Sequence, residues 1–438
     1  MVHVAKTVTR LAAALSTTYE WVGLDNYTDA VCNDGSPAGY YWSPSSMMGM
    51  PPTWLVYLAG GNWCFNKKDC KIRCPPEYLR NNLSWPGEGL CSSKRYPQTM
   101  DMQGVLSPSH PDSVVGMANK VFVMYCSSDG HMGNSHAFGL EFRGARIIEA
   151  VFQDLVQKRG MAREEGHTVI LGGVSAGARG AMVNLDYVPE FVADAGGTTK
   201  GLQVYGLLDS PLWMDMPPMV KSGFYGFRHS CRSVRNFANV TRLGKRCAEA
   251  FPERQRFKCL MGEYRVAYLD TPFFMVASQF DSFQLMFNIG PEGTGGDDEK
   301  DYVSDFGNRT LSFVSQLNVT SIGLYSPSCF THARSTTTEG WSVDGVEQYD
   351  ENGEHHMIPM EDAFQEWIVD VREAQGSRTD ESKGVSPRKW IDNCEGVACG
   401  PGCPLDPDPS AHAAPRSGRS LALTLSMSLL TTLFCAFL

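Results

Sequence analysis

The 438-residue chain has no excess of positive charge. It carries 38 Lys and Arg against 48 Asp and Glu, which gives a formal net charge of −10 at pH 7. General electrostatic attraction to nucleic acid or to an anionic membrane surface requires the opposite sign. The sequence therefore predicts no nucleic-acid partner. Hydrophobic residues make up 42% of the chain, which is enough for the core of a globular protein.

The chain also lacks the cysteine spacing of a zinc site. None of its 14 cysteines stands in a C-x-x-C pair, so the usual zinc-finger arrangement is absent and no metal site is predicted. Clustered cysteines without that spacing favour disulfides, which form in oxidising compartments. Five Asn-x-Ser/Thr sequons fit the same compartment: Asn26, Asn82, Asn239, Asn308 and Asn318. We therefore expect a protein of the secretory pathway, extracellular or at the cell surface.

The two ends of the chain predict different things. Residues 1–23 have a basic start but only a short apolar stretch, which is a weak signal peptide. Residues 420–438 carry no charge, and 19 helical residues nearly span the ~30 Å core of a bilayer. Residues 406–419, before them, are polar and small, like a stalk. We expect a membrane tether through this tail, either a GPI-attachment signal or a tail anchor.

Short apolar runs recur along the chain, and no internal repeat is visible. The runs end in Gly, Ser or Asp and cover residues 53–60, 120–129, 167–173, 201–210 and 273–281. Such runs are typical of buried parallel strands, and a helix is expected between two of them, at 139–160. The alternation predicts a mostly parallel α/β sheet with helices on both faces, whose site lies at the carboxyl edge of the strands.

The domain organisation follows from this pattern. Residues 24–375 form the predicted catalytic domain, within which residues 211–265, with three cysteines, are expected to be an insertion over the functional edge of the sheet. Residues 376–405 are expected to be a cysteine-rich extension because the composition turns to Ser, Arg, Asp, Pro and Cys.

One motif at the functional edge carries chemistry. Residues 173–177, GVSAG, match G-x-S-x-G between a strand-like and a helix-capable segment. A sharp turn there lifts the hydroxyl of Ser175 clear of the backbone, and small neighbours permit the strained geometry. The pentapeptide alone is weak evidence, because a glycine turn with an incidental serine has the same letters. In its context it predicts that Ser175 is a nucleophile.

A serine nucleophile needs a base and an acid that orients the base, in the chain order Ser, acid, His for this kind of sheet. His332 follows the apolar run 321–330 and is the predicted base. Asp281 follows another strand-like run and is the predicted acid, with Asp209 as the runner-up. As alternatives, Asp281 caps a helix and His332 is an ordinary loop histidine.

Acyl transfer also needs backbone N–H donors for the developing oxyanion. The N–H of Ala176 comes directly after the nucleophile. Gly60, Gly61 and Asn62 follow a strand-like run, where the second donor loop of such hydrolases lies, and a simple glycine turn is the alternative. Four aromatic residues are candidates for lining an acyl pocket, with core packing as the alternative: Trp63, Phe65, Trp85 and Trp213.

Several collinear stretches resemble the pectin acetylesterase and Notum family. They are CNDGSPAGYY (32–41), LVYLAGGNWCFNKKDC (55–70), YCSSDGHMG (125–133), LGGVSAGARGAMVNLDYV (171–188), GLLDSP (206–211), FDSFQL (280–285) and SPSCFTHA (326–333). The cysteine-rich end, CEGVACGPGCP (394–404), resembles that of Notum proteins. The resemblance implies an α/β-hydrolase-like fold with disulfide-rich insertions and a serine carboxylesterase that needs no cofactor.

The resemblance also implies roles for single residues. They are Ser175 as nucleophile, Asp281 as acid, His332 as base, Gly61, Asn62 and Ala176 as oxyanion donors, and a Cys64–Cys70 disulfide. Some positions depart from the family pattern: Ala59 where Glu is usual, Asn62 where Notum has a bulkier aromatic, and Ala178 and Arg179 after Gly177. None of these removes a catalytic group, but they lie where the acyl pocket, and hence the choice of substrate, is expected to differ from that of relatives.

The expected function is an extracellular serine esterase that removes acetyl groups from a polysaccharide such as pectin. A Notum-like enzyme that removes a fatty acyl group from a secreted protein is the alternative within the same class. From another class, the chain could be an inactive binding or adhesion member of the family. Partners are therefore an acylated polysaccharide or an acylated secreted protein, and a membrane through the tail.

Overall fold

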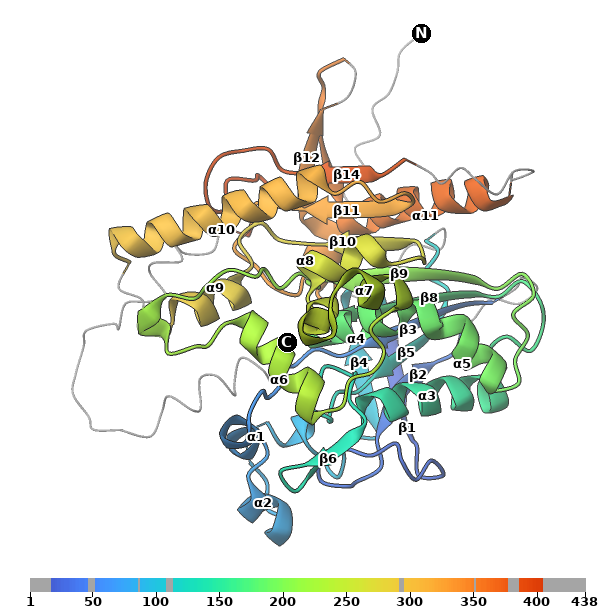
Figure 1. The fold of residues 1–438 in the computed structure, drawn as a ribbon. Coiled ribbons are helices and arrows are strands. Elements are labelled where there is room, and N and C mark those ends of the chain that lie inside the picture. The colour runs from blue at the N-terminus through green and yellow to red at the C-terminus, as the bar shows by residue number, and fades with distance from the viewer. Residues whose placement is uncertain are drawn as a thin grey trace.

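A ten-stranded, mostly parallel sheet forms the centre of the protein (Figure 1). A computed structural model describes residues 17–45, 52–85, 87–107, 113–290, 295–349, 352–376 and 386–404. The strand order is β14-β11-β10-β9-β8-β3-β5-β2-β1-β4. The strands from β14 to β5 run parallel to their neighbours, and β2, β1 and β4 extend the sheet antiparallel. The predicted mostly parallel sheet is confirmed.

The strands and helices have the following bounds. The sheet contains β1 (Thr17–Gly23), β2 (Gly39–Ser43), β3 (Thr53–Leu58), β4 (Thr99–Met102), β5 (Asn119–Val123), β8 (Thr168–Val174), β9 (Gln203–Asp209), β10 (Phe273–Val276), β11 (Ile322–Ser326) and β14 (Arg388–Ile391). Two small sheets pair β6 (Ser135–Ala137) with β7 (Leu140–Phe142), and β12 (Gly345–Tyr349) with β13 (His355–Pro359). The helices are α1 (Lys67–Arg73), α2 (Pro76–Asn81), α3 (Gly144–Asp154), α4 (Ala176–Asn184), α5 (Val188–Asp194), α6 (Phe227–Phe237), α7 (Lys245–Ala250), α8 (Gly262–Arg265), α9 (Ser282–Ile289), α10 (Asp297–Gln316) and α11 (Met360–Gly376).

Both faces of the sheet are buried, which explains why its strands are continuous apolar runs. In β3, Val56 and Leu58 pack in one core with residues of α3, α5 and α10, whereas Leu55 and Tyr57 pack in a second core with residues of α11. Figure 1 shows α3 and α5 next to each other on one side of the sheet. Because successive strand residues point to opposite faces, a two-sided core requires apolar residues at every position.

The order of the strands reverses direction at β3. After β3 the chain forms β5 on one side of it, and it later returns to form β8 on the other side. The loops that leave β3 and β8 therefore diverge at the carboxyl edge, and this is the position where open α/β sheets bind ligands. The loop after β3 contains Gly60, Gly61 and Asn62, and the turn after β8 contains Ser175.

Two local features differ from the predictions. The helix expected at 139–160 begins only at Gly144, because residues 140–142 pair with β6 as β7. The insertion 211–265 forms α6, α7 and α8, but its three cysteines make one disulfide, Cys247–Cys259, and Cys231 stays a buried free thiol.

Six disulfides are present in the described part of the chain, so the prediction of disulfides is confirmed. They join Cys32–Cys126, Cys64–Cys70, Cys74–Cys91, Cys247–Cys259, Cys329–Cys403 and Cys394–Cys399. Of the 376–405 segment, residues 388–391 are the edge strand β14, paired with β11. Among the described residues, no helix has the length and apolar character needed to cross a membrane. The predicted stalk, the apolar tail and most of the weak signal segment lie outside the described residues.

Candidate active site

Ser175 lies at a sharp turn between β8 and α4. Its backbone has φ 56° and ψ −118°, a conformation that costs energy for any residue with a side chain. The flanking glycines allow the turn: a Cβ on Gly177 would lie 2.0 Å from the carbonyl oxygen of Leu58, and one on Gly173 would lie 2.5 Å from the backbone of Gly177. Helix α4 therefore packs directly on β3, and the strand–turn–helix arrangement predicted around Ser175 is present.

The loop after β3 lies against this turn. A Cβ on Gly60 would come within 3.2 Å of the Ser175 Cβ, so the two backbone segments touch. Gly61 has φ 138° and Asn62 has φ 55°, and both values are far from ordinary extended backbone. The Gly61 carbonyl accepts a hydrogen bond from Arg73 Nη2 at 2.6 Å. The structure thus places the two predicted donor segments, this loop and the start of α4, side by side.

A buried histidine holds the beginning of the same loop. His131 Nε2 lies 2.9 Å from the Ala59 carbonyl oxygen, and since a carbonyl only accepts, this nitrogen carries the hydrogen. His131 Nδ1 has no hydrogen-bond partner among the described residues. Burial lowers the pKa of His131 to about 4, so the ring is neutral at physiological pH. Sequence reasoning missed this residue, because nothing in the YCSSDGHMG stretch shows that it folds beneath Ala59.

Replacing His131 by glutamine should make the free energy of unfolding depend less on pH in the acid range. In the wild type, the unfolded histidine titrates near 6.5 and the folded one near 4. Between these values the unfolded chain binds more protons, so the free energy of unfolding should fall as the pH falls, by on the order of 3 kcal/mol from this group. Chemical denaturation of both proteins at pH 7 and pH 4.5 measures the difference. Parallel pH dependences would contradict the assignment of a neutral buried ring.

His332 and Asp281 form a close pair. His332 Nδ1 lies 2.8 Å from Asp281 Oδ2, and the two side chains are 6% and 5% exposed. Because a carboxylate only accepts, Nδ1 carries the hydrogen and Nε2 is the acceptor nitrogen of the neutral ring. His332 Nε2 is buried and has no hydrogen-bond partner among the described residues. Phe283 stacks on the imidazole with ring centroids 5.0 Å apart and so helps to hold its orientation.

Asp281 also caps helix α9. The helix-cap role, considered from the sequence as an alternative to the acid role, is therefore present together with the Asp281–His332 hydrogen bond. Its Oδ1 accepts a hydrogen bond from the Gln284 N–H at 2.9 Å at the start of α9, while Oδ2 faces His332. The cap fixes the carboxylate, since one oxygen is tied to the helix backbone and the other is left to orient the imidazole.

Asp209, the runner-up acid, has different partners. Its Oδ2 accepts hydrogen bonds from the N–H and the hydroxyl of Ser335, at 2.7 and 2.6 Å, and its carbonyl accepts from the Ser175 N–H at 2.9 Å. The hydroxyl of Ser210 accepts from the N–H of Ala333, the residue after His332. Hydrogen bonds from the end of β9 therefore connect the Ser175 turn to the His332 loop. Asp209 takes part in these bonds and does not face the imidazole.

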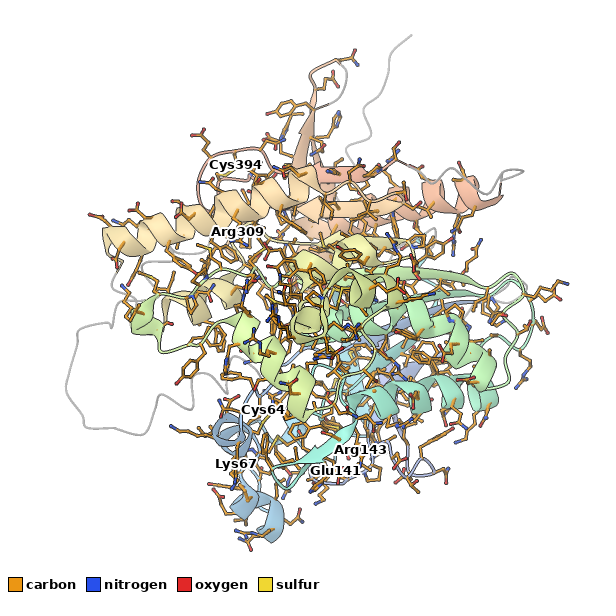
Figure 2. All side chains as sticks on the ribbon, viewed as in Figure 1. Cys64, Lys67, Glu141, Arg143, Arg309 and Cys394 are labelled. Carbon is orange, nitrogen blue, oxygen red and sulfur yellow. A yellow bond between two sulfur atoms is a disulfide. The ribbon has the colours of Figure 1, made fainter. Side chains whose placement is uncertain are left out.

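Disulfides brace two parts of the edge. Cys64–Cys70 closes the loop that begins at Gly60, and this confirms the pairing implied by the family resemblance. Cys329–Cys403 ties the segment just before His332 to the C-terminal extension. The second disulfide of the extension joins Cys394 to Cys399, and Figure 2 shows Cys394 in the upper part of the view and Cys64 in the lower part. One crosslink thus holds the loop after β3, and another holds the segment before His332.

The aromatic candidates divide into two groups. Trp63 and Trp213 come together, with ring centroids 3.5 Å apart. Phe65 lies instead against Phe224, and Trp85 against Tyr78 of α2. Within the described residues, no group of three or more His, Cys, Asp and Glu side chains is arranged to hold a metal ion.

Three features together define an α/β-hydrolase-like protein. They are a mostly parallel sheet, a strained serine between β8 and α4, and a paired histidine and carboxylate at the carboxyl edge of the sheet. The chain belongs to the pectinacetylesterase family, whose sequence model matches residues 12–404. It is 28% identical over 400 residues to the palmitoleoyl-protein carboxylesterase notum2 of Xenopus laevis, covering 86% of this chain and 72% of that one. It is 31% identical over 321 residues to the palmitoleoyl-protein carboxylesterase NOTUM of Drosophila melanogaster, covering 70% of this chain and 43% of the other.

A solved structure has the same fold. The Wnt deacylase Notum from Drosophila superimposes with a TM-score of 0.71 at 24% sequence identity, over 89% of this chain and all of that one. The α/β-hydrolase-like fold implied by the sequence is therefore confirmed.

Proposed function

We propose that this protein is a serine carboxylesterase with Ser175 as nucleophile, His332 as general base and Asp281 as the acid that orients the base. The observation that carries the proposal is the His332–Asp281 pair, whose acceptor nitrogen Nε2 has no partner among the described residues. An unengaged Nε2 at the edge of the sheet that carries the strained serine is what a general base for Ser175 requires.

The proposed reaction has two halves. Ser175 Oγ attacks the ester carbonyl while His332 Nε2 takes its proton, and the imidazolium then gives that proton to the departing alcohol oxygen. Water, activated by the same nitrogen, hydrolyses the acyl-enzyme. Asp281 Oδ2 stabilises the imidazolium through the hydrogen bond to Nδ1. The N–H groups of Gly61, Asn62 and Ala176 are the proposed donors to the tetrahedral oxyanion, because their two segments meet beside Ser175.

The proposed substrate is an O-acetylated polysaccharide. The family to which the chain belongs is described as pectinacetylesterase, which supports an acetyl ester on a glycan. A second candidate is a fatty acyl ester on a secreted protein, because the curated relatives are named palmitoleoyl-protein carboxylesterases. The same nucleophile and base serve both, and the space available to the acyl group separates them.

A chain-length series tests the substrate proposal. The purified protein should hydrolyse p-nitrophenyl acetate with a higher kcat/KM than the butyrate, octanoate and palmitate esters, and it should release acetate from acetylated pectin. A preference for acyl chains above eight carbons would contradict the acetyl proposal and support the protein-deacylase alternative.

We also propose that the enzyme acts outside the cell and is tethered there by residues 420–438. The six disulfides support the oxidising compartment, since such bonds persist in secreted proteins. The tether rests on the uncharged apolar tail in the sequence.

A further inference from the structure

Arg179 lies one helical turn after Ser175 on α4. Residues four apart share a face of a helix, and helical side chains lean toward the N-terminus, so the Arg179 side chain extends back toward the nucleophile. It is 0% exposed. Its guanidinium carbon lies 3.3 Å from the ring centroid of Trp213 and 5.4 Å from that of Trp63. A cation is thus buried in an aromatic environment close to the serine turn.

We name these three residues, Trp63, Trp213 and Arg179, the Trp–Trp–Arg stack, because Trp213 contacts both of the others. Trp63 directly follows Asn62 of the oxyanion loop, Trp213 lies just after β9, and Arg179 is on the helix that begins at Ser175. The two tryptophans are 2% and 1% exposed. Three segments that leave the carboxyl edge of the sheet therefore each contribute one side chain to a single packed unit.

The stack continues toward the proposed base. The ring of Trp213 lies 6.2 Å from that of Phe283, and Phe283 stacks on His332. An aromatic row thus runs from the oxyanion loop to His332. In the proposed reaction the leaving oxygen faces His332 Nε2 and the carbonyl oxygen faces the oxyanion loop. An acyl chain that extends from the ester carbonyl toward this row would meet Arg179 beside Trp63 and Trp213.

The buried guanidinium of Arg179 has few hydrogen-bond acceptors and no ion-pair partner of its own among the described residues. Nη1 donates a hydrogen bond to the Leu260 carbonyl at 3.2 Å, and Nε and Nη2 have no hydrogen-bond partner among the described residues. Burial lowers the pKa of Arg179, and two nearby groups oppose that effect, Cys231 and Asp281. Burial raises the pKa of the Cys231 thiol to about 12, so it is neutral, and Asp281 is hydrogen-bonded to His332.

Arg179 is held firmly where it lies. Cation–π attraction holds the guanidinium on the tryptophan faces, so the side chain does not readily move aside for an alkyl chain. The surrounding aromatic side chains are suited to an acyl group, whereas Arg179 takes up the volume that several methylenes would need.

We propose that Arg179 is a specificity-determining residue that closes the acyl-binding space and restricts the enzyme to acyl groups of about acetyl size. This inference rests on the proposed function, because it takes Ser175 as the nucleophile of an esterase.

The test is a graded series at position 179 in the full-length protein: Arg179→Met, Arg179→Val and Arg179→Ala. The quantity measured is kcat/KM for p-nitrophenyl octanoate divided by that for p-nitrophenyl acetate. We expect this ratio to rise by about tenfold or more in Arg179→Ala and by less in Arg179→Val, because one methylene in an apolar pocket changes kcat/KM by roughly 10-fold or more. Methionine has nearly the length of arginine, so its ratio should stay within about threefold of the wild type.

A second fully buried arginine provides the matched control. Arg265 donates to the Leu243 carbonyl at 2.7 Å and pairs with Asp186, so Arg265→Met removes a buried guanidinium outside the stack. The octanoate-to-acetate ratio should not change in this variant. Thermal melts establish which variants fold, and the valine variant keeps the series informative if the alanine variant does not.

The outcomes separate this inference from the proposed function. An unchanged ratio in folded Arg179→Ala and Arg179→Val overturns the role of Arg179 and leaves the esterase proposal intact. A methionine variant that shifts as much as the alanine variant also overturns it, because charge and not volume would then select the acyl group. A wild type that hydrolyses none of the esters overturns both proposals.

Discussion

Replacing Ser175 by alanine should lower kcat for p-nitrophenyl acetate by a factor on the order of 10⁶, as loss of the nucleophile does in a serine hydrolase. The hydroxyl is the atom that forms the acyl-enzyme, and the neighbouring backbone donors cannot replace it. The substitution removes one oxygen from a side chain that is 6% exposed, so folding should be preserved. Steady-state kinetics on the purified protein, with a thermal melt of each variant, measures the effect.

The matched control is Ser342→Ala. Ser342 donates a hydrogen bond to Glu361 at the start of α11 and is not part of the proposed catalytic machinery, so its loss should leave kcat unchanged. Turnover in the Ser175 variant equal to that of the wild type would refute the mechanism. A folded wild-type protein with no esterase activity would instead support the alternative that the chain is an inactive binding member of the family.

Replacing Asp281 by asparagine should lower kcat by about 10⁴-fold with little loss of stability. An amide offers an oxygen to the Gln284 N–H, so the cap of α9 can remain, but it cannot stabilise an imidazolium at His332. The NH₂ group can also force the ring into the wrong tautomer, in which Nε2 carries the hydrogen and cannot accept the serine proton. Kinetics at pH 7 to 8 and a thermal melt separate the two effects.

Asp209→Asn is the comparison that distinguishes the two candidate acids. Asp209 is buried, its Oδ2 accepts two hydrogen bonds from Ser335, and its Oδ1 accepts one from the Ser210 hydroxyl at 3.0 Å. Since an amide has only one oxygen, at least one of these donors loses its acceptor. This variant should lose about 1–3 kcal/mol of the free energy of unfolding. Its fall in kcat should be far smaller than that of Asp281→Asn. If Asp209→Asn instead shows the larger loss of kcat at equal stability, the acid has been assigned to the wrong carboxylate.

Most of the parallel sheet could be predicted because its strands are recognisable from local sequence. Each lies between two buried faces, so its residues form an unbroken apolar run that ends in a polar or small residue at the carboxyl edge. The antiparallel strands β1, β2 and β4 were not predicted, and neither were α10 and α11. The three strands lie toward one edge of the sheet, beyond its parallel part. Each helix buries only one of its faces, α10 in the first core and α11 in the second, so its apolar residues alternate with polar ones.

Some residues of the candidate site could likewise be placed from the sequence, and others could not. The turn around Ser175 could be predicted because its two glycines are required within five residues of each other. His131 and Arg179 could not be assigned a place, because their positions depend on contacts with Ala59 and Trp213, which are distant in the sequence.

By itself, the sequence determined the alternation of strands and helices, the strand–turn–helix segment around Ser175 and the use of cysteines as disulfides. These features depend on neighbouring residues, whose spacing and chemistry are visible in the chain. Only the tertiary structure decided that Asp281 and not Asp209 faces His332, that Cys231 has no disulfide partner, and that Arg179 is buried against Trp213. The physical reason is that each of these depends on which strand ends are adjacent in the sheet, and adjacency is set by packing among residues far apart in sequence.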